Sequence, residues 1–298
     1  MGKASRNKRA GSARDRIAAQ RAAARQREVR NRVFFTSGAV VVVIAIVLAF
    51  VLVKINKSPA KADGGTATGT TLSASVMNDL TTVPASTLAT VGAGTTYSKP
   101  VIPIKGSPLT SAGKPEVVYI GAEYCPYCAT ERWAMAVALS RFGTFSGLHG
   151  IRSSSTDVFP STPTLTFYKS TYTSKYVTFT PVEEETVSKA PLQKPTAAQN
   201  ELITKFDAPP YVSQQNAGSI PFVDFGNQFM ISGASYNPQV LQGKTWSEVA
   251  AALKDPTSDI AKGADGTANL MTAAICKLTN NQPATACTPA VQSLEKSL

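Results

Sequence analysis

The sequence predicts a mixed α/β domain preceded by one transmembrane helix. Residues 33–53 (VFFTSGAVVVVIAIVLAFVLV) carry no charge, and a helix of this length spans the roughly 30 Å hydrocarbon core of a bilayer. Further along the chain, the β-branched run 116–121 precedes residues 129–142, which are rich in Ala, Leu and Met. A buried strand followed at once by a helix is typical of α/β domains. With 298 residues, the chain is long enough to bury such a core.

Positive charge is concentrated before the apolar segment. Residues 1–32 contain eleven Lys or Arg residues against two acidic ones, whereas the net charge of the whole chain is +11. The positive-inside rule places this basic tail in the cytoplasm and the residues after 53 outside the cell. We therefore expect a single-pass protein of the cell membrane, in which lipids contact the segment 33–53 and the basic tail.

Two other interpretations of the N-terminal region are weaker. Ala60-Lys61-Ala62 has the pattern of a signal-peptide cleavage site, but the apolar segment is longer than the roughly 7–15 residues of a signal-peptide core, which favours an uncleaved anchor. The basic tail could also be a short DNA-binding arm. Because the rest of the chain is nearly neutral, nucleic acid is not expected as a partner.

The outer part of the chain divides into a linker and one domain. Residues 54–75 are mostly small or polar, which predicts a flexible linker, and residues 76–298 are expected to form the extracytoplasmic domain. Patterns of apolar and turn residues predict its other elements. These are a helical turn from Pro84 to Gly92, a strand at 148–152, a hairpin of 164–169 with 175–180, a helix at 196–206, strands on both sides of Gly226-Asn227, a helix at 245–253 with a capping box formed by Thr245 and Glu248, and a last helix at 269–278.

Cys125 and Cys128 lie between the predicted strand and helix, in the stretch EYCPYCATERW. This order places Cys125 at a helix N-terminus, where the helix dipole and unpaired N–H groups favour a thiolate, the nucleophile of disulfide exchange. Pro126 occupies a position where its missing N–H is tolerated. We therefore expect Cys125 to be the nucleophile and Cys128, one turn later, to be the resolving cysteine.

Two alternatives compete with a redox pair. A zinc site needs about four ligands, and the chain adds to the pair only His149 and the distant Cys276 and Cys287, so no metal is expected. A static Cys125–Cys128 disulfide is the second alternative, although a structural bridge needs neither a helix N-terminus nor a preceding strand. Cys276 and Cys287 flank a polar loop and are expected to form a structural disulfide.

The run VYIGAEYCPYC, with an aromatic residue before the first cysteine, resembles the active-site strand and turn of thioredoxin-like proteins. Pro126-Tyr127 resembles the glutaredoxin type, and SIPFV, which contains Pro221, resembles the cis-proline loop that faces the cysteines in these folds. The resemblance implies a thioredoxin-like fold, meaning a central mixed sheet flanked by helices, with an insertion at about 150–216 and a cis Pro221. It also implies a substrate groove made of Pro221, Ile220, Tyr124, Pro126 and Tyr127.

The sequence departs from thioredoxins where a proton acceptor is expected. Tyr119 stands at the position of their buried acid, and Ala129 follows Cys128 where they carry a lysine. Glu123, Glu131 and Tyr119 are the candidates for a proton relay. Both glutamates, like the run 183–185, are more simply interpreted as solvated charges.

A longer stretch, GKPEVVYIGAEYCPYCATERWAMAVALSRFG with the later SSTDVFP, YTSKYVTF and IPFVDFGN, resembles an uncharacterised archaeal and bacterial family called domain of unknown function 929. This resemblance covers roughly residues 76–290 and implies no substrate. We expect a membrane-anchored extracytoplasmic thiol–disulfide oxidoreductase that needs no cofactor. Its partners would be thiols or disulfides of exported proteins and an unidentified redox partner. The alternative is a non-catalytic thioredoxin-like binding module with a static Cys125–Cys128 disulfide.

Overall fold

The computed structural model describes residues 69–298. The predicted basic tail, the predicted transmembrane segment and the predicted linker up to residue 68 lie outside these residues. Within 69–298, no helix combines the length and the apolar character that a membrane crossing requires. The described part combines helices with a mixed sheet, so the predicted α/β class is confirmed.

The central strand of the domain is β4 (Lys114–Gly121), which contains the predicted β-branched run. It pairs antiparallel with β10 (Phe222–Phe225) and parallel with β9 (Thr178–Glu183). In this register Tyr119 lies opposite Val223 on one side and Pro181 on the other. The carboxyl end of β4, where the cysteines follow, is therefore flanked by strands on both edges.

Further strands extend this sheet at its edges. β11 (Phe229–Ser232) pairs with β10 across a tight turn at Gly226-Asn227, and both of these residues have positive φ, as the central residues of a type I′ turn require. The two strands predicted around this turn are confirmed. The short strands β2 (Ile102–Pro103) and β3 (Thr110–Ser111) pair with β11 and β4, respectively.

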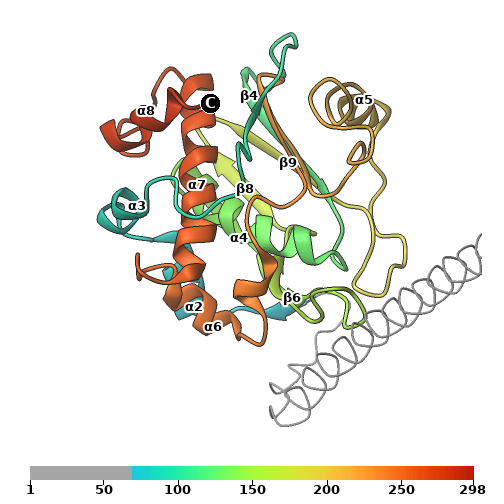
Figure 1. Cartoon of the computed structure of the whole chain (residues 1–298), viewed down its shortest axis with the longest axis vertical. Coiled ribbons are helices and arrows are strands. Elements are labelled where there is room, and N and C mark those ends of the chain that lie inside the picture. Colours follow the sequence, from blue (N-terminus) through green and yellow to red (C-terminus); the bar gives the residue numbers. More distant parts are fainter. Residues whose placement is uncertain (1–68) are drawn as a thin grey trace, which may run out of the picture. The chain divides into compact units, whose positions relative to one another are not determined.

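Helices cover both faces of the central sheet because the side chains of β4 alternate between two cores. Val117 and Tyr119 belong to the larger core, whereas Val118 and Ile120 belong to the smaller one. Figure 1 shows the sheet strands β4 and β9 between α7 and α5. The larger core contains α4 (Pro126–Ser140) and α7 (Asp259–Leu278), and the smaller one contains α5 (Ala197–Phe206).

Helix α4 follows β4 as predicted and is buried along almost all of its length. Its middle turns are small or apolar, and the indole N–H of Trp133 donates to the carbonyl of Pro163 at 2.9 Å. Only a helix that packs against neighbours on several sides can be buried in this way. Every charged side chain that it carries toward these neighbours therefore needs an internal partner.

The predicted hairpin of 164–169 with 175–180 is wrong. One phenylalanine of each run, Phe167 and Phe179, packs against the other with 5.0 Å between ring centroids, and both contact Phe145. An alternating pattern does not specify which strand is the partner. β7 (Pro163–Thr166) pairs with β6 (His149–Arg152), which also pairs with β1 (Thr70–Thr71), and β8 (Thr171–Ser174) pairs with β5 (Gly143–Ser146).

Two predicted boundaries also need correction. The expected insertion at 150–216 contains β9, which is part of the central sheet, whereas β5 to β8 lie outside that sheet. The expected linker would end at residue 75, but Thr70–Thr71 form β1, and Ser73 caps the next helix. Leu72 explains this difference, because it is buried in the larger core and holds the segment to the domain.

The predicted last helix, 269–278, begins ten residues earlier and is not the last. Ser258 caps α7, and Gly263 and Gly266 lie inside it. These glycines lower helix propensity, yet close packing requires them: a Cβ on Gly266 would lie 2.5 Å from the carbonyl oxygen of Ala93, and one on Gly263 would lie 2.5 Å from the ring of Tyr236.

The other predicted helices are present, and the capping box predicted at Thr245 is confirmed. Thr196 and Thr245 each form a capping box with the residue three positions later, and Gly92 ends the helix after Pro84. The helix after Pro84 is α3 (Ala85–Val91), and the one that Thr245 caps is α6 (Trp246–Ala252). The remaining helices are α2 (Ala74–Thr81), the 3-10 helix η1 (Pro238–Leu241) and α8 (Pro289–Glu295).

The predicted disulfide between Cys276 and Cys287 is confirmed. It joins the end of α7 to the segment before α8 across a sequence separation of 11 residues. Both cysteines are buried in the larger core. The bridge therefore holds the C-terminal segment against the helix that covers the sheet.

Replacing both bridging cysteines, in Cys276→Ala with Cys287→Ala, is expected to lower the free energy of unfolding by about 3 kcal/mol, because a loop of this length is no longer closed in the unfolded chain. Chemical denaturation of the full chain measures the loss. Cys125→Ser is the control, since serine keeps a helix cap and leaves the bridge intact. Equal losses in the two variants would contradict a structural role.

Asp265 on α7 gives the stability of the fold a pH dependence. Its side chain is buried, and neither carboxylate oxygen has a hydrogen-bond partner within the described part of the chain. Burial raises the pKa of Asp265 to about 8, with Arg141 as the opposing charge. From the ordinary carboxylate range up to pH 8, the folded state holds a proton that the unfolded state has lost, so stability falls as the pH rises.

Asp265→Asn removes this titration. The variant is expected to gain stability relative to the unchanged chain between pH 5 and pH 8, with a slope of at most about 1.4 kcal/mol per pH unit. Denaturation at both pH values measures the difference between the two proteins. A difference that is the same at pH 5 and pH 8 would show that Asp265 ionises normally.

Candidate dithiol site

Cys125 and Cys128 are both free thiols, and local geometry distinguishes them. Cys125 is the N-cap of α4, and its sulfur accepts a hydrogen bond from the backbone N–H of Cys128 at 3.2 Å. Pro126 follows in the first helical turn, as predicted. Cys125 is 4% exposed and Cys128 is fully buried. Cys125 is thus the cysteine of the pair nearer to solvent.

The pKa values of the two thiols are shifted in opposite directions. A hydrogen bond from the Cys128 thiol is the main cause that lowers the pKa of Cys125, and backbone N–H groups of the first helical turn act in the same direction. Burial raises the pKa of Cys128 well above its ordinary value. At neutral pH, Cys125 is therefore the better thiolate, which suits the nucleophile, and Cys128 stays protonated.

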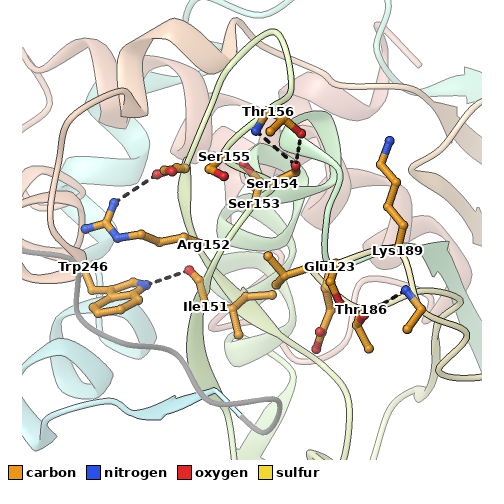
Figure 2. A pocket seen from close by; sticks show the side chains of 14 residues that line it. Glu123, Ile151, Arg152, Ser153, Ser154, Ser155, Thr156, Thr186, Lys189 and Trp246 are labelled. Atoms are coloured by element: carbon orange, nitrogen blue, oxygen red, sulfur yellow. Dashed lines mark hydrogen bonds between the residues drawn. The ribbon is translucent and has the colours of Figure 1, made fainter. Parts of the chain in front are cut away.

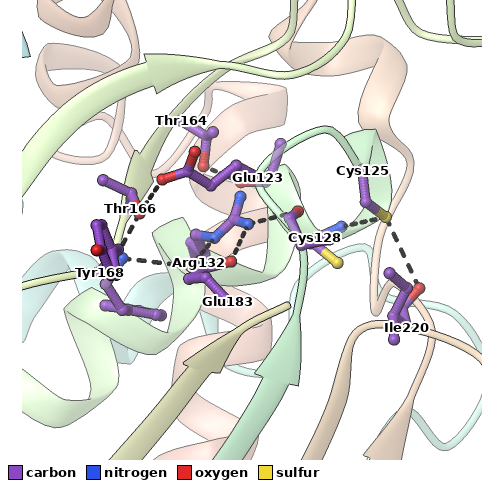
Figure 3. Close-up of polar contacts among 12 residues, drawn as sticks. Glu123, Cys125, Cys128, Arg132, Thr164, Thr166, Tyr168, Glu183 and Ile220 are labelled. Atoms are coloured by element: carbon purple, nitrogen blue, oxygen red, sulfur yellow. Dashed lines mark hydrogen bonds and ion pairs between the residues drawn. The ribbon is translucent and has the colours of Figure 1, made fainter. Parts of the chain in front are cut away.

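The loop before β10 faces Cys125. The Ile220–Pro221 peptide bond is cis, as the resemblance implied. The Cys125 thiol lies 3.8 Å from the carbonyl oxygen of Ile220, to which it donates a hydrogen bond, and Figure 3 shows this contact on the side of the pair away from Glu123. The structure thus brings Cys125 together with Ile220, although 95 residues separate them in sequence.

Aromatic side chains lie beside the pair. Tyr127 is 39% exposed, and its ring packs edge-on against Phe159 with 5.8 Å between centroids. Tyr124 is half-buried, and the ammonium group of Lys189 lies 4.7 Å from its ring centroid. Pro126 is buried within the first turn of α4. Of the three neighbours predicted for the groove from this stretch, Tyr127 therefore presents the most surface.

A buried ion pair lies directly beneath the dithiol, and the sequence did not predict it. Arg132 donates from Nε to Oε1 of Glu183 at 2.8 Å and from Nη2 to Oε2 at 2.7 Å. Both side chains are fully buried. Arg132 Nη2 also donates to the carbonyl of Ala122 at 2.7 Å, so the pair links α4, β9 and the chain just before the cysteines (Figure 3).

The prediction that residues 183–185 form a solvated acidic face is therefore wrong for Glu183, because β9 ends against α4 and the carboxylate meets Arg132 there. One signal was available in the sequence. Arg132, like its neighbour Glu131, is a charged residue in a helix whose next residues, 133–139, are all small or apolar, and a charge buried on such a helix requires a partner. The identity of that partner was not readable, since it lies 51 residues away.

Tyr119, the residue at the position of the expected acid, is fully buried under the site. Its hydroxyl has no hydrogen-bond partner among residues 69–298. Burial raises the pKa of Tyr119 well above its ordinary value, so the phenol stays neutral. Arg132 lies 5.8 Å from its ring centroid. Tyr119 therefore keeps its proton and can act here as a hydrogen-bond donor, not as an acceptor for the proton of Cys128.

Glu123 and Glu131 are not solvated, in contrast to the prediction. Glu123 is 3% exposed and accepts a hydrogen bond from the hydroxyl of Thr166 at 2.7 Å. Glu131 is fully buried and accepts from the backbone N–H and the hydroxyl of Ser235 at 2.9 and 2.7 Å. Burial raises the pKa of Glu131 to about 7. Its carboxylate holds the segment after β11, a structural contact between residues too distant in sequence to be predicted from local patterns.

A cavity of about 780 Å³ adjoins the site on the side of Glu123. Figure 2 shows Trp246 and Arg152 on one side of it and Lys189 on the other. Much of the remaining lining consists of serine and threonine side chains from the segments 153–161 and 186–188. The N–H of Ser154 donates to the carbonyl of Tyr124 at 2.8 Å, so this wall is joined to the cysteine loop.

No group of three or more His, Cys, Asp or Glu side chains that could hold a metal ion occurs within residues 69–298. The dithiol site consists of one thiol of lowered pKa that is 4% exposed, one fully buried thiol of raised pKa, and a carbonyl beside the first. Chemically, it can form a disulfide with an external sulfur and then close an internal one.

Neither a curated protein nor a solved structure matches the chain. The family model described as Domain of unknown function (DUF929) matches residues 100–277, a range that runs from the segment before β2 almost to the end of α7. The match includes both cysteines of the dithiol, the buried ion pair and Pro221, and it covers more than half of the sequence. The chain therefore belongs to the DUF929 family.

Proposed function

We propose that the chain is a thiol–disulfide oxidoreductase that exchanges disulfides with exported proteins. One observation carries this proposal: Cys125 caps α4, has a lowered pKa and lies against the carbonyl of Ile220, while Cys128 is buried behind it. A static bridge needs none of these asymmetries, whereas exchange needs one thiol that attacks and another that resolves.

A thioredoxin-like fold is part of the proposal. It is supported by the mixed central sheet with helices on both faces, by the dithiol between β4 and α4, and by the cis Ile220–Pro221 bond before β10. On this view β5 to β8, outside the central sheet, are the addition to the fold. The cavity beside Glu123 lies next to that addition.

The exchange balances without a cofactor. The Cys125 thiolate attacks a substrate disulfide, forms a mixed disulfide and releases the first substrate sulfur as a thiolate. The Cys128 thiolate then attacks the Cys125 sulfur, closes the Cys125–Cys128 disulfide and releases the second substrate sulfur. The substrate is reduced by two electrons and the dithiol is oxidised by two. The two protons from the dithiol end on the substrate thiols, and the reverse sequence oxidises a substrate.

The proposed location also rests on the sequence. The uncharged segment 33–53 would anchor the chain in the cell membrane and place residues 69–298 outside the cytoplasm. The Cys276–Cys287 disulfide supports an oxidising compartment, where such bridges persist. The partners would then be exported proteins and a second redox protein that restores the dithiol or the disulfide.

Single-cysteine variants test the assigned roles. Cys128→Ser is expected to accumulate a mixed disulfide with a disulfide-bonded peptide, because Cys125 attacks but nothing resolves the intermediate. Cys125→Ser is expected to lose all exchange above background. Mass spectrometry of the full chain in detergent micelles detects the adduct. Exchange by Cys125→Ser at the unchanged rate would contradict the proposal.

The reduction potential separates exchange from the alternative of a static bridge. The Cys125–Cys128 disulfide is expected to lie within the range of catalytic disulfides, roughly −270 to −120 mV, because the lowered pKa of Cys125 stabilises the reduced form. Equilibration of the full chain with glutathione or dithiothreitol buffers measures it. A value below about −300 mV would favour a binding module with a structural disulfide.

A further inference from the structure

The buried position of Cys128 creates a chemical problem. Cys128 must become a thiolate to resolve a mixed disulfide, yet it has no exposed surface, and a buried anion is unstable without nearby positive charge or hydrogen-bond donors. The two carboxylates predicted as proton relays form their hydrogen bonds with other side chains. Glu123 is bonded to Thr166 and Glu131 to Ser235.

Arg132 supplies the positive charge. Its guanidinium is fully buried one helical turn after Cys128, and its charge favours the Cys128 thiolate. Nε and Nη2 are occupied by Glu183 and by the carbonyl of Ala122. Nη1 has no hydrogen-bond partner within the described residues. One arm of this buried cation is therefore left without a hydrogen-bond partner.

Tyr119, on β4, supplies a hydrogen-bond donor from the strand that precedes α4. A Cβ placed on Gly121 would lie 2.2 Å from the Tyr119 hydroxyl oxygen and 3.0 Å from the Cys128 sulfur. The hydroxyl and the sulfur therefore face the same small space, which exists because residue 121 has no side chain. The Tyr119 hydroxyl has no partner there among residues 69–298.

We propose that Arg132 and Tyr119 are positioning residues that stabilise the Cys128 thiolate while the mixed disulfide is resolved, and that Glu183 limits how much of the arginine's charge acts on the sulfur. This inference rests on the proposed exchange function. Tyr119 keeps its proton and donates a hydrogen bond. The proton that Cys128 gives up ends on the departing substrate thiolate, so no further acceptor is consumed.

The charged and titratable groups around Cys128 determine whether each substitution stabilises or destabilises the Cys128 thiolate. They are Cys125, Tyr119 and Arg132, with Glu183 and Glu123 beside the arginine. Arginine stays charged when it loses its partner. Glu183→Gln therefore removes the bonded counter-charge of the cation and favours the thiolate, whereas loss of the whole pair or of the phenol disfavours it. A purely structural ion pair would not produce effects of opposite sign.

One equivalent of the aromatic disulfide DTNB separates the two steps in a stopped-flow experiment on the reduced full chain in detergent micelles. Cys125 releases the first thionitrobenzoate, and attack by Cys128 releases the second. Glu183→Gln is expected to accelerate the second phase, and Tyr119→Phe to slow it, each toward the tenfold that one pKa unit represents. Arg132→Met with Glu183→Leu, which leaves no unpaired buried charge, is expected to slow it as well.

Asp265→Asn is the matched control, because it makes the same carboxyl-to-amide change at another buried side chain, whose opposing charge is a different arginine, Arg141. It is expected to leave both phases unchanged. Second phases that stay within twofold in Tyr119→Phe and in the double variant, or a slower one in Glu183→Gln, would overturn the inference. If Glu183→Gln does not fold, Tyr119→Phe and the double variant decide alone. Absence of the first phase in the unchanged chain would instead contradict the exchange function itself.

Discussion

The Arg132–Glu183 ion pair is the interaction on which the arrangement around the dithiol depends. It joins α4 to β9 at the point where the sheet, the helix and the cysteine loop meet, and its third contact holds the carbonyl of Ala122. A buried pair of this kind gains little net stability over apolar packing, but the loss of one partner costs about 3–5 kcal/mol. Its value is therefore positional, because it sets how α4 approaches the strand that carries the loop.

The position of α4 determines the chemistry of the two sulfurs. The first turn of the helix directs N–H groups at Cys125, while the depth of the helix in the larger core removes Cys128 from water. Hydrogen bonds to Cys125 thus lower the pKa of one thiol, while burial raises the pKa of another only three residues later. Burial also explains why Tyr119, rather than an acid, can stand below the pair: a neutral phenol tolerates a site that would penalise a carboxylate.

Local patterns in the sequence predicted what depends on neighbouring residues. The strand β4, the helix α4, the cap at Cys125 and the capping box at Thr245 each follow from a few consecutive side chains. Partners that are distant in sequence were not predictable in this way. The burial of Glu183 depends on a strand far along the chain meeting Arg132, and the pairing of β6 with β7 depends on packing that alternation alone does not encode.

The disulfide at the end of α7 is buried even more completely than Cys125, which is 4% exposed, and this burial matters for the proposed exchange function. Cys276 has no exposed surface, and Cys287 is only 2% exposed. An attacking thiolate must approach a disulfide sulfur directly, so in the folded state Cys125 of a second copy cannot reach this bridge. The chain is thereby protected from scrambling its own bond, and that bond must form before the C-terminal segment closes over it.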